Sequence, residues 1–271
     1  MQSRTARTSR STSEAGLAWA SVVDAHGRHY FSDEFNHRIV VEDLAGSTWS
    51  FGQPGQGAGD LRFPRGLAIQ SASNSEATRI FVADSWNHRI QVFDGTGRLR
   101  FAFGGRGNKD GQFHAPADLV IAYPALPGEG ERGAREALPV LVVADQWNSR
   151  IQVFTLEGAW LATLGGRTST RRDSGATLEA WPFFRTGTVG VPRDPVRLSW
   201  QGSWLTVVGG NGRAHQLDLA AALLPTFDEW QQTAPVAERA HARRYFGLSR
   251  NGRRQVPAGV LQALAIDVHV A

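Results

Sequence analysis

The residues with the richest chemistry in this sequence are a carboxylate, an amide and a guanidinium that recur with one spacing. The three sets are Asp33, Asn36 and Arg38; Asp84, Asn87 and Arg89; and Asp145, Asn148 and Arg150. Such a set could form a reactive or binding site, but a single active site does not need three successive copies. Aspartate and asparagine are typical of tight turns, because their side chains bond nearby backbone amides. We therefore expect a structural role, in which each arginine holds its aspartate across a turn by a charge-assisted pair.

Histidines and glycine-rich loops stand beside these sets. His37 and His88 share one repeat position, where the third copy has Ser149. A metal ion needs three or four convergent ligands, and we expect equivalent positions on successive repeats to lie far apart. The loops 52–59 and 104–111 lack the Gly-Lys-Ser/Thr ending of a phosphate-binding loop, and neither opens a helix. We predict no catalytic residue, no metal and no cofactor.

The sets belong to a longer repeat with a fixed order of elements. In the second copy, an apolar strand at Leu67–Ile69 is followed by a strand that ends in Asp84, a turn, and two further strands over 89–93 and 98–103. Four strands per unit is the pattern of a β-propeller blade. The motif resembles the NHL repeat, named for the Asn-His-Leu-like core seen here as Asn36-His37-Arg38-Ile39 and Asn87-His88-Arg89-Ile90. The resemblance covers roughly residues 17 to 220 and implies an all-β propeller of NHL-type four-stranded blades.

A degraded fourth unit sets the expected blade number at about four. Its first three strands are predicted over 196–200, 204–208 and 213–217. The blades either close into a ring, which we favour, or form an open arc whose free edges invite a second copy, giving a homodimer, or another partner. We expect a flexible basic arm over 1–15, the propeller over 16–225, a C-terminal helical segment over 226–250, and a returning strand within 251–271.

Two long insertions interrupt the repeat. Ser71–Thr78 and Tyr123–Leu138 both fall between the first and second strands of their units. We expect them to project together from neighbouring blades. Long insertions on a rigid scaffold often carry function.

The best candidate ligand site surrounds the proline that opens each blade. These residues enter the innermost strands beside the central channel, where loops from every blade converge. Their mostly positive charge would suit an anionic or acidic ligand, although a solvated rim without a ligand would have the same composition. The candidate ligand-binding residues are Arg62, Arg65, His114, Asp118, Arg193 and Arg197.

The aromatic residues divide into two groups. Trp86 and Trp147, with Phe35 in the first copy, share one repeat position, and we expect them to wedge between blades as core. The helical segment, clearest over Phe227–Phe246, offers a second surface. Its candidate partner-binding residues are Trp230, Arg243, Arg244 and Tyr245.

Composition bounds the cellular setting and the charge. The 271 residues contain no cysteine, which excludes disulfides and thiolate metal sites, and the N-terminus lacks the apolar region of a secretory signal. Apolar runs are strand-sized, so we expect a soluble, cytoplasmic protein with no membrane partner. The net charge is +4 and Lys109 is the single lysine. Arginine is the better bidentate partner for carboxylate and phosphate, although a GC-rich genome, which favours arginine codons, would produce the same bias.

Three functional classes stay open. A non-catalytic protein-interaction scaffold or accessory subunit is expected first, because no nucleophile and base accompany the repeats. Single-stranded RNA binding is the alternative, since some NHL propellers bind RNA, but we find no clear alternation of exposed aromatics and arginines. A metal-dependent lyase or hydrolase is the third. Similar propellers include a zinc lyase that needs histidines from several blades, and here only His114 stands at such a position, with Arg62 and Arg193 at the others.

Overall fold

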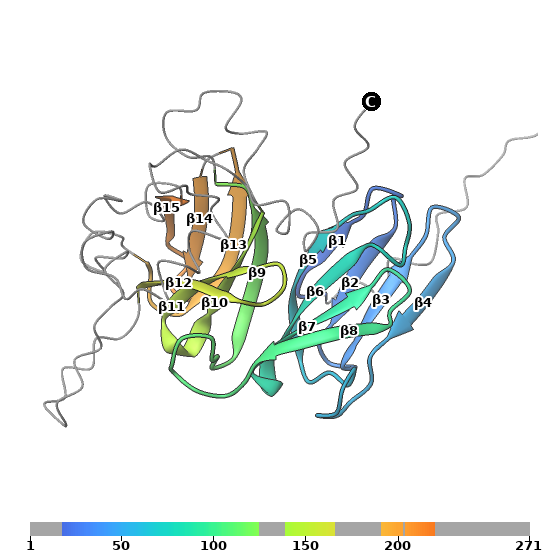
Figure 1. The fold of residues 1–271 in the computed structure, drawn as a ribbon, viewed down its shortest axis with the longest axis horizontal. Coiled ribbons are helices and arrows are strands. Elements are labelled where there is room, and N and C mark those ends of the chain that lie inside the picture. Colours follow the sequence, from blue (N-terminus) through green and yellow to red (C-terminus); the bar gives the residue numbers. More distant parts are fainter. Residues whose placement is uncertain (1–17, 125–138, 166–190, 203, 220–271) are drawn as a thin grey trace, which may run out of the picture.

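The computed structural model describes residues 18–124, 139–165, 191–202 and 204–219, which form four antiparallel sheets. The sheets are the blades of a β-propeller, so the predicted all-β propeller fold is confirmed (Figure 1). Three blades have four strands, and the fourth has three strands in the described part of the chain. The helical segment over 226–250, the returning strand within 251–271 and the arm over 1–15 all lie outside the described residues.

Each blade uses consecutive strands of the chain, which pair as neighbours. The first blade contains β1 (Ser21–Val23), β2 (His29–Asp33), β3 (Arg38–Glu42) and β4 (Thr48–Phe51). The second contains β5 (Pro64–Gln70), β6 (Arg79–Asp84), β7 (Arg89–Asp94) and β8 (Leu99–Gly104). The third contains β9 (Pro116–Ala122), β10 (Val140–Asp145), β11 (Arg150–Thr155) and β12 (Trp160–Gly165). The fourth contains β13 (Pro195–Gln201), β14 (Trp204–Gly209) and β15 (Ala214–Asp218).

These bounds confirm the predicted order of strands, including the degraded fourth unit. The insertion over Ser71–Thr78 separates β5 from β6, and the one over Tyr123–Leu138 separates β9 from β10, as predicted. Both insertions therefore leave from the same end of their blades. Residues 125–138 of the second lie outside the described part.

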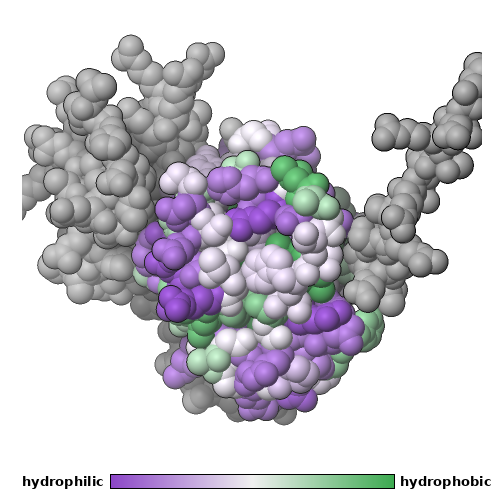
Figure 2. Space-filling model, turned by 90° about the vertical axis from the view of Figure 1, so that its right-hand side faces the viewer, coloured by the Kyte–Doolittle hydropathy of each residue, from purple (hydrophilic) through white to green (hydrophobic). Residues whose placement is uncertain are grey.

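The apolar pattern of each strand follows from its place in the blade. All six residues of β10 are buried, because neighbouring blades cover both of its faces, and its sequence is a continuous run of Val, Leu and Ala up to Asp145. Only Phe51 of the four residues in the outermost strand β4 is buried. Figure 2 faces the side of the molecule where the first blade lies, and hydrophobic residues appear there as small patches among hydrophilic ones.

Three hydrophobic cores lie between successive blades. Ile80 and Val82 of β6 pack toward the first blade with Tyr30 and Ile39, whereas the intervening Phe81 and Ala83 pack toward the third blade. This division is the period of two of a β-strand, whose successive side chains point to opposite faces. A third core joins Val140 and its neighbours to the fourth blade. Each of the three cores therefore joins two successive blades.

The innermost strands approach closely around the centre. β5 packs against β1, β2 and β9, and β9 packs against β13. A Cβ atom at Gly66 of β5 would lie 2.5 Å from the Cα of Asp118 in β9, so only glycine fits there. Among the described residues no helix is long and apolar enough to span a membrane.

Replacing Phe81 by alanine should lower the free energy of unfolding by about 3–5 kcal/mol, because its ring is fully buried between the second and third blades. The control is Leu44→Ala at a side chain that is 81% exposed, which should change stability by no more than about 0.5 kcal/mol. Urea denaturation measured by tryptophan fluorescence checks both values. Equal losses in the two variants would contradict the assigned core.

Candidate binding face

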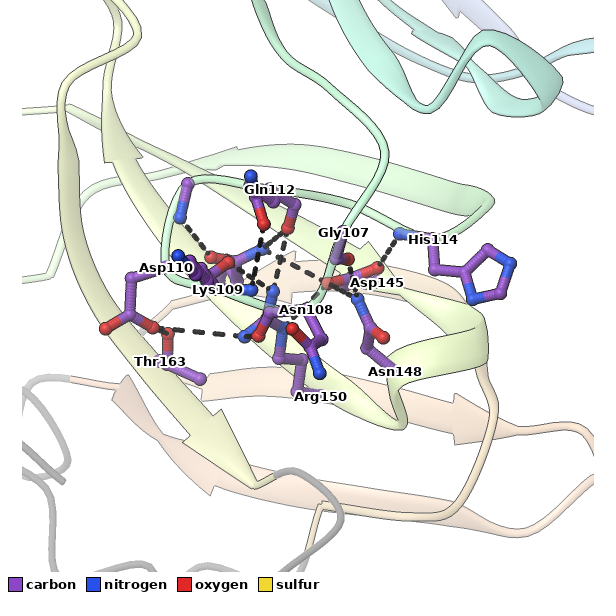
Figure 3. Close-up of polar contacts among 12 residues, drawn as sticks. Gly107, Asn108, Lys109, Asp110, Gln112, His114, Asp145, Asn148, Arg150 and Thr163 are labelled. Atoms are coloured by element: carbon purple, nitrogen blue, oxygen red, sulfur yellow. Dashed lines mark hydrogen bonds and ion pairs between the residues drawn. The ribbon is translucent and has the colours of Figure 1, made fainter. Parts of the chain in front are cut away.

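The repeated aspartate, asparagine and arginine form a clasp that holds the connector leading into the same blade (Figure 3). In the third blade Asp145 is fully buried and accepts hydrogen bonds from the Arg150 Nε at 2.7 Å and the Asn148 Nδ2 at 2.8 Å. It also accepts one from the backbone N–H of His114 at 2.7 Å. The remaining guanidinium nitrogens of Arg150 donate to the carbonyls of Asn108, Lys109 and Gln112.

The second blade repeats this clasp. Asp84 accepts from the Arg89 Nε at 2.8 Å and from the backbone N–H of Arg62 at 2.7 Å. Arg89 donates in turn to the carbonyls of Gln56, Gly57 and Asp60. The glycine-rich loops thus present carbonyls to an arginine of their own chain. The predicted structural role of the three polar sets is confirmed, with Arg38 and Asp33 at 2.9 Å in the first blade.

The turn inside the clasp exposes its middle residue. After Asp84 the chain makes one 3₁₀ turn over Ser85–Asn87, and the third blade does the same over Gln146–Asn148. Trp86 is 41% exposed and Trp147 is 47% exposed. The equivalent Phe35 is 65% exposed. The prediction that these three aromatics wedge between blades is therefore wrong, because they stand on turns beyond the ends of the strands.

Trp86 and Trp147 belong to a continuous line of rings, which we call the aromatic ridge: His37, Phe63, Trp86, Trp147 and His114. Along it, successive ring centroids lie 4.6, 5.1, 6.3 and 4.8 Å apart. The ridge runs from the turn of the first blade, through the connector before β5, to the turns of the second and third blades. The guanidinium of Arg62 lies over the Trp86 ring, 5.5 Å from its centroid.

His37 and His88, which share one repeat position, fix the connectors that follow their blades. The Nδ1 atom of His37 accepts from the backbone N–H of Phe63 at 2.9 Å, and that of His88 accepts from Ala115 at 3.0 Å. All four residues have left-handed backbone, with φ between 50° and 59°. Each histidine therefore joins a turn to the connector of the next blade. His88 also lies 5.4 Å from the ring of His114, but among the described residues no three His, Asp or Glu side chains come together as a metal site.

The structure divides the six predicted ligand-binding residues between two places. Arg62 and His114 lie on the face that carries the ridge, and the imidazole of His114 points away from the clasp in Figure 3. Arg65 and Arg197 lie at the centre, over the Trp19 ring at 4.4 and 4.7 Å from its centroid. Because Trp19 precedes β1 and Arg197 belongs to β13, this contact joins the fourth blade to the first. Arg193 is exposed in the connector before β13.

Asp118 is buried at this centre rather than accessible at a channel mouth. It is 6% exposed and accepts hydrogen bonds from the backbone N–H of Leu198 at 2.8 Å and of Leu119 at 3.0 Å. Its carboxylate thereby ties β9 to β13 across the boundary between the third and fourth blades. Burial raises the pKa of Asp118 to about 6, against the lowering effect of these hydrogen bonds and of the Arg197 charge.

Arg65 has further partners that the sequence did not suggest. Its guanidinium lies 3.2 Å from Glu34 and 3.2 Å from the Gln146 side chain. These contacts connect the turns of the first and third blades through a residue of the second. The predicted partner-binding residues Trp230, Arg243, Arg244 and Tyr245 lie outside the described residues.

Comparison with known proteins supports the propeller and leaves the family open. No family model matches the chain. The protein named brain tumor of Drosophila melanogaster is 28% identical over 129 residues, which is 48% of this chain and 11% of that protein. This chain therefore spans about a tenth of the length of that relative.

Solved structures with partial similarity include a chain in a nidogen–laminin complex, with 19% identity and a TM-score of 0.47 over 76% of this chain and 62% of that one. A streptogramin B lyase is 13% identical, with a TM-score of 0.42 over 73% of this chain and 53% of that one.

The central carboxyl generates a prediction on stability and pH. The pKa of Asp118 is raised from 3.8 to about 6 by folding, so the folded protein binds the proton more tightly, and stability should fall as pH rises from about 4 to 6. Above pH 6 the ionised carboxylate costs about 3 kcal/mol. Asp118→Asn should therefore remove this pH dependence and raise the free energy of unfolding at pH 8 relative to wild type.

Denaturation at pH 5 and at pH 8 measures this effect. The control is Glu76→Gln, at an exposed carboxylate, which should keep the pH dependence of wild type. A pH dependence of Asp118→Asn equal to that of wild type would show that Asp118 does not titrate in this range.

Proposed function

We propose that this chain is a non-catalytic propeller of the NHL type that acts as a protein-interaction scaffold or accessory subunit, with the aromatic ridge as its binding surface. One observation carries the proposal. Trp86 and Trp147 are 41% and 47% exposed. Their ring centroids lie 6.3 Å apart across the boundary between the second and third blades. Exposed tryptophans in contact with each other and with arginine have the composition of an interaction hot spot.

The NHL assignment rests on the repeated Asn-His-Arg-Ile core and on the roles of its residues. The asparagine and arginine hold the aspartate and the connector, and the histidine holds the next connector. The similarity to the brain tumor protein covers 48% of this chain and agrees with a propeller of this type.

The geometry of the ridge favours a protein partner over single-stranded RNA. Base stacking needs ring faces that successive bases can cover. Here His37 meets Phe63 at 87°, Trp86 meets Trp147 at 65°, and Trp147 meets His114 at 82°. Three of the four neighbouring pairs are thus packed edge to face, and Phe63 and Trp86 are tilted by 40°. This packing makes a contiguous aromatic surface suited to an aliphatic or aromatic anchor of a protein.

RNA binding is the second candidate, and one observation favours it. The sequence showed no clear alternation of aromatics and arginines, but the fold places the guanidinium of Arg62 over the exposed ring of Trp86. An arginine beside an exposed aromatic is one element of single-stranded RNA recognition. The test of the protein partner must therefore include nuclease.

Removing both tryptophans, in the double variant Trp86→Ala Trp147→Ala, should strongly reduce capture of the partner. The protein is tagged, expressed in its native host and purified with its partner, with and without nuclease. Wild type should retain a nuclease-resistant protein in near-stoichiometric amount, and the double variant should retain at least about tenfold less, since hot-spot truncations typically cost 2 kcal/mol or more.

The matched control is Trp204→Ala, at a tryptophan that is 49% exposed in the fourth blade, and it should capture the partner like wild type. Thermal melting establishes that all variants fold, because exposed positions change stability by about 0.5 kcal/mol or less. Retention of the partner by the double variant would refute the ridge as its binding surface. Recovery of nuclease-sensitive material alone would replace the protein partner by RNA.

A further inference from the structure

Two exposed arginines flank the aromatic ridge from consecutive connectors. Arg62 precedes β5, and its carbonyl accepts a hydrogen bond from the backbone N–H of Trp86 at 3.1 Å. Arg106 precedes β9, beside Gly105, whose N–H donates to the carbonyl of His88 at 3.0 Å. Both connectors are thus fixed to the turn of the second blade, and the guanidinium of Arg62 lies over the Trp86 ring of that turn.

The carboxylates near this face are already engaged. Asp84 and Asp145 are fully buried within their clasps, and Glu34 pairs with Arg65. Within the described residues, neither Arg62 nor Arg106 belongs to an ion pair. The ridge is therefore bordered by positive charge that forms no ion pair with a described residue.

The neighbourhood of His88 shows that these charges converge. Burial lowers the pKa of His88, and the positive charges of His114, Arg106 and Arg62 lower it further. The imidazole Nδ1 of His88 is occupied by the backbone N–H of Ala115. Of these side chains, Arg62 lies over the Trp86 ring and His114 lies against the Trp147 ring, and the His88 ring is 5.4 Å from that of His114.

We propose that the segment of the partner protein that docks on the aromatic ridge is acidic, with aspartate or glutamate side chains beside an apolar anchor. This inference rests on the proposed function. The anchor would cover Trp86 and Trp147, and the carboxylates would pair with Arg62 and Arg106. Guanidinium groups bind carboxylates in bidentate geometry, and they are more weakly hydrated than ammonium groups, so they are the better cations for an interface.

The test is selection from a random peptide display library against the immobilised full chain. The consensus peptide is then synthesised with its acidic residues and with their amide counterparts, and binding is measured by fluorescence anisotropy. We expect a consensus that combines acidic and large apolar residues. The amide version should bind wild type at least about tenfold more weakly, equivalent to about 1.4 kcal/mol.

Protein variants locate the charge. The double variant Arg62→Gln Arg106→Gln should bind the acidic peptide about tenfold more weakly and should bind the acidic and amide peptides alike. The matched control removes the same charge from exposed arginines elsewhere, as Arg98→Gln Arg213→Gln, and should bind like wild type. Raising the salt concentration should weaken binding of the acidic peptide more than binding of the amide peptide.

Each alternative outcome is distinct. Peptides that lose binding in Trp86→Ala Trp147→Ala but show no acidic preference would overturn this inference and leave the ridge as a protein-binding surface. Selected peptides that bind both double variants like wild type would count against the inference and the proposed function together. Oligouridylate RNA is the probe for the remaining alternative. If it binds wild type more tightly than any selected peptide, and if both double variants lose this binding, the ridge is assigned to RNA instead.

Discussion

The structure depends on a buried carboxylate in each of its central blades. Asp84 and Asp145 are fully buried at the ends of their strands, where an ionised group is stable only if donors surround it. The chain supplies these donors from its own turn and from the preceding connector, so that satisfying one carboxylate fixes both segments. Loss of one member of such a buried pair typically costs about 3–5 kcal/mol, because the other charge stays buried without compensation. The clasp therefore holds each blade to the chain that enters it.

The binding face follows from this constraint. The side chains of Asp84, Asn87 and Arg89 all turn toward the clasp, so the residue at the middle of the turn has no strand beneath it and faces solvent. The clasp also brings Arg62 beside Trp86, since the backbone of Arg62 donates to Asp84 and accepts from Trp86. The same local structure in the third blade places the imidazole of His114 against Trp147, because the backbone of His114 donates to Asp145 and accepts from Trp147. Repetition on neighbouring blades joins them into one surface.

The sequence was sufficient for the fold and for the role of the polar sets, because both depend on local pattern. Strand periodicity and turn residues predict the blades, and three identical spacings identify a structural motif. The positions of Trp86 and Trp147 could not be predicted from repeat position alone, because a place that recurs in each repeat can lie either in the core or on the surface. Their flanking residues held the missing signal: an aromatic between Asp84 and Asn87 sits inside a turn that the clasp itself predicts. The distances between residues of different blades, such as Trp86 and Trp147, depend on how the blades pack.

The centre of the propeller explains why binding is proposed on the face and not in a channel. With four blades the innermost strands lie so close that Gly66 leaves no room for a Cβ atom beside Asp118. The Trp19 ring lies against the guanidinium groups of Arg65 and Arg197, and Asp118 is engaged by backbone N–H groups of β9 and β13. Of the charged residues that sequence position places at the channel, Arg65, Asp118 and Arg197 are therefore used to hold the blades together. A ligand at the centre would have to displace these contacts, whereas a partner on the aromatic ridge would cover side chains that are already exposed.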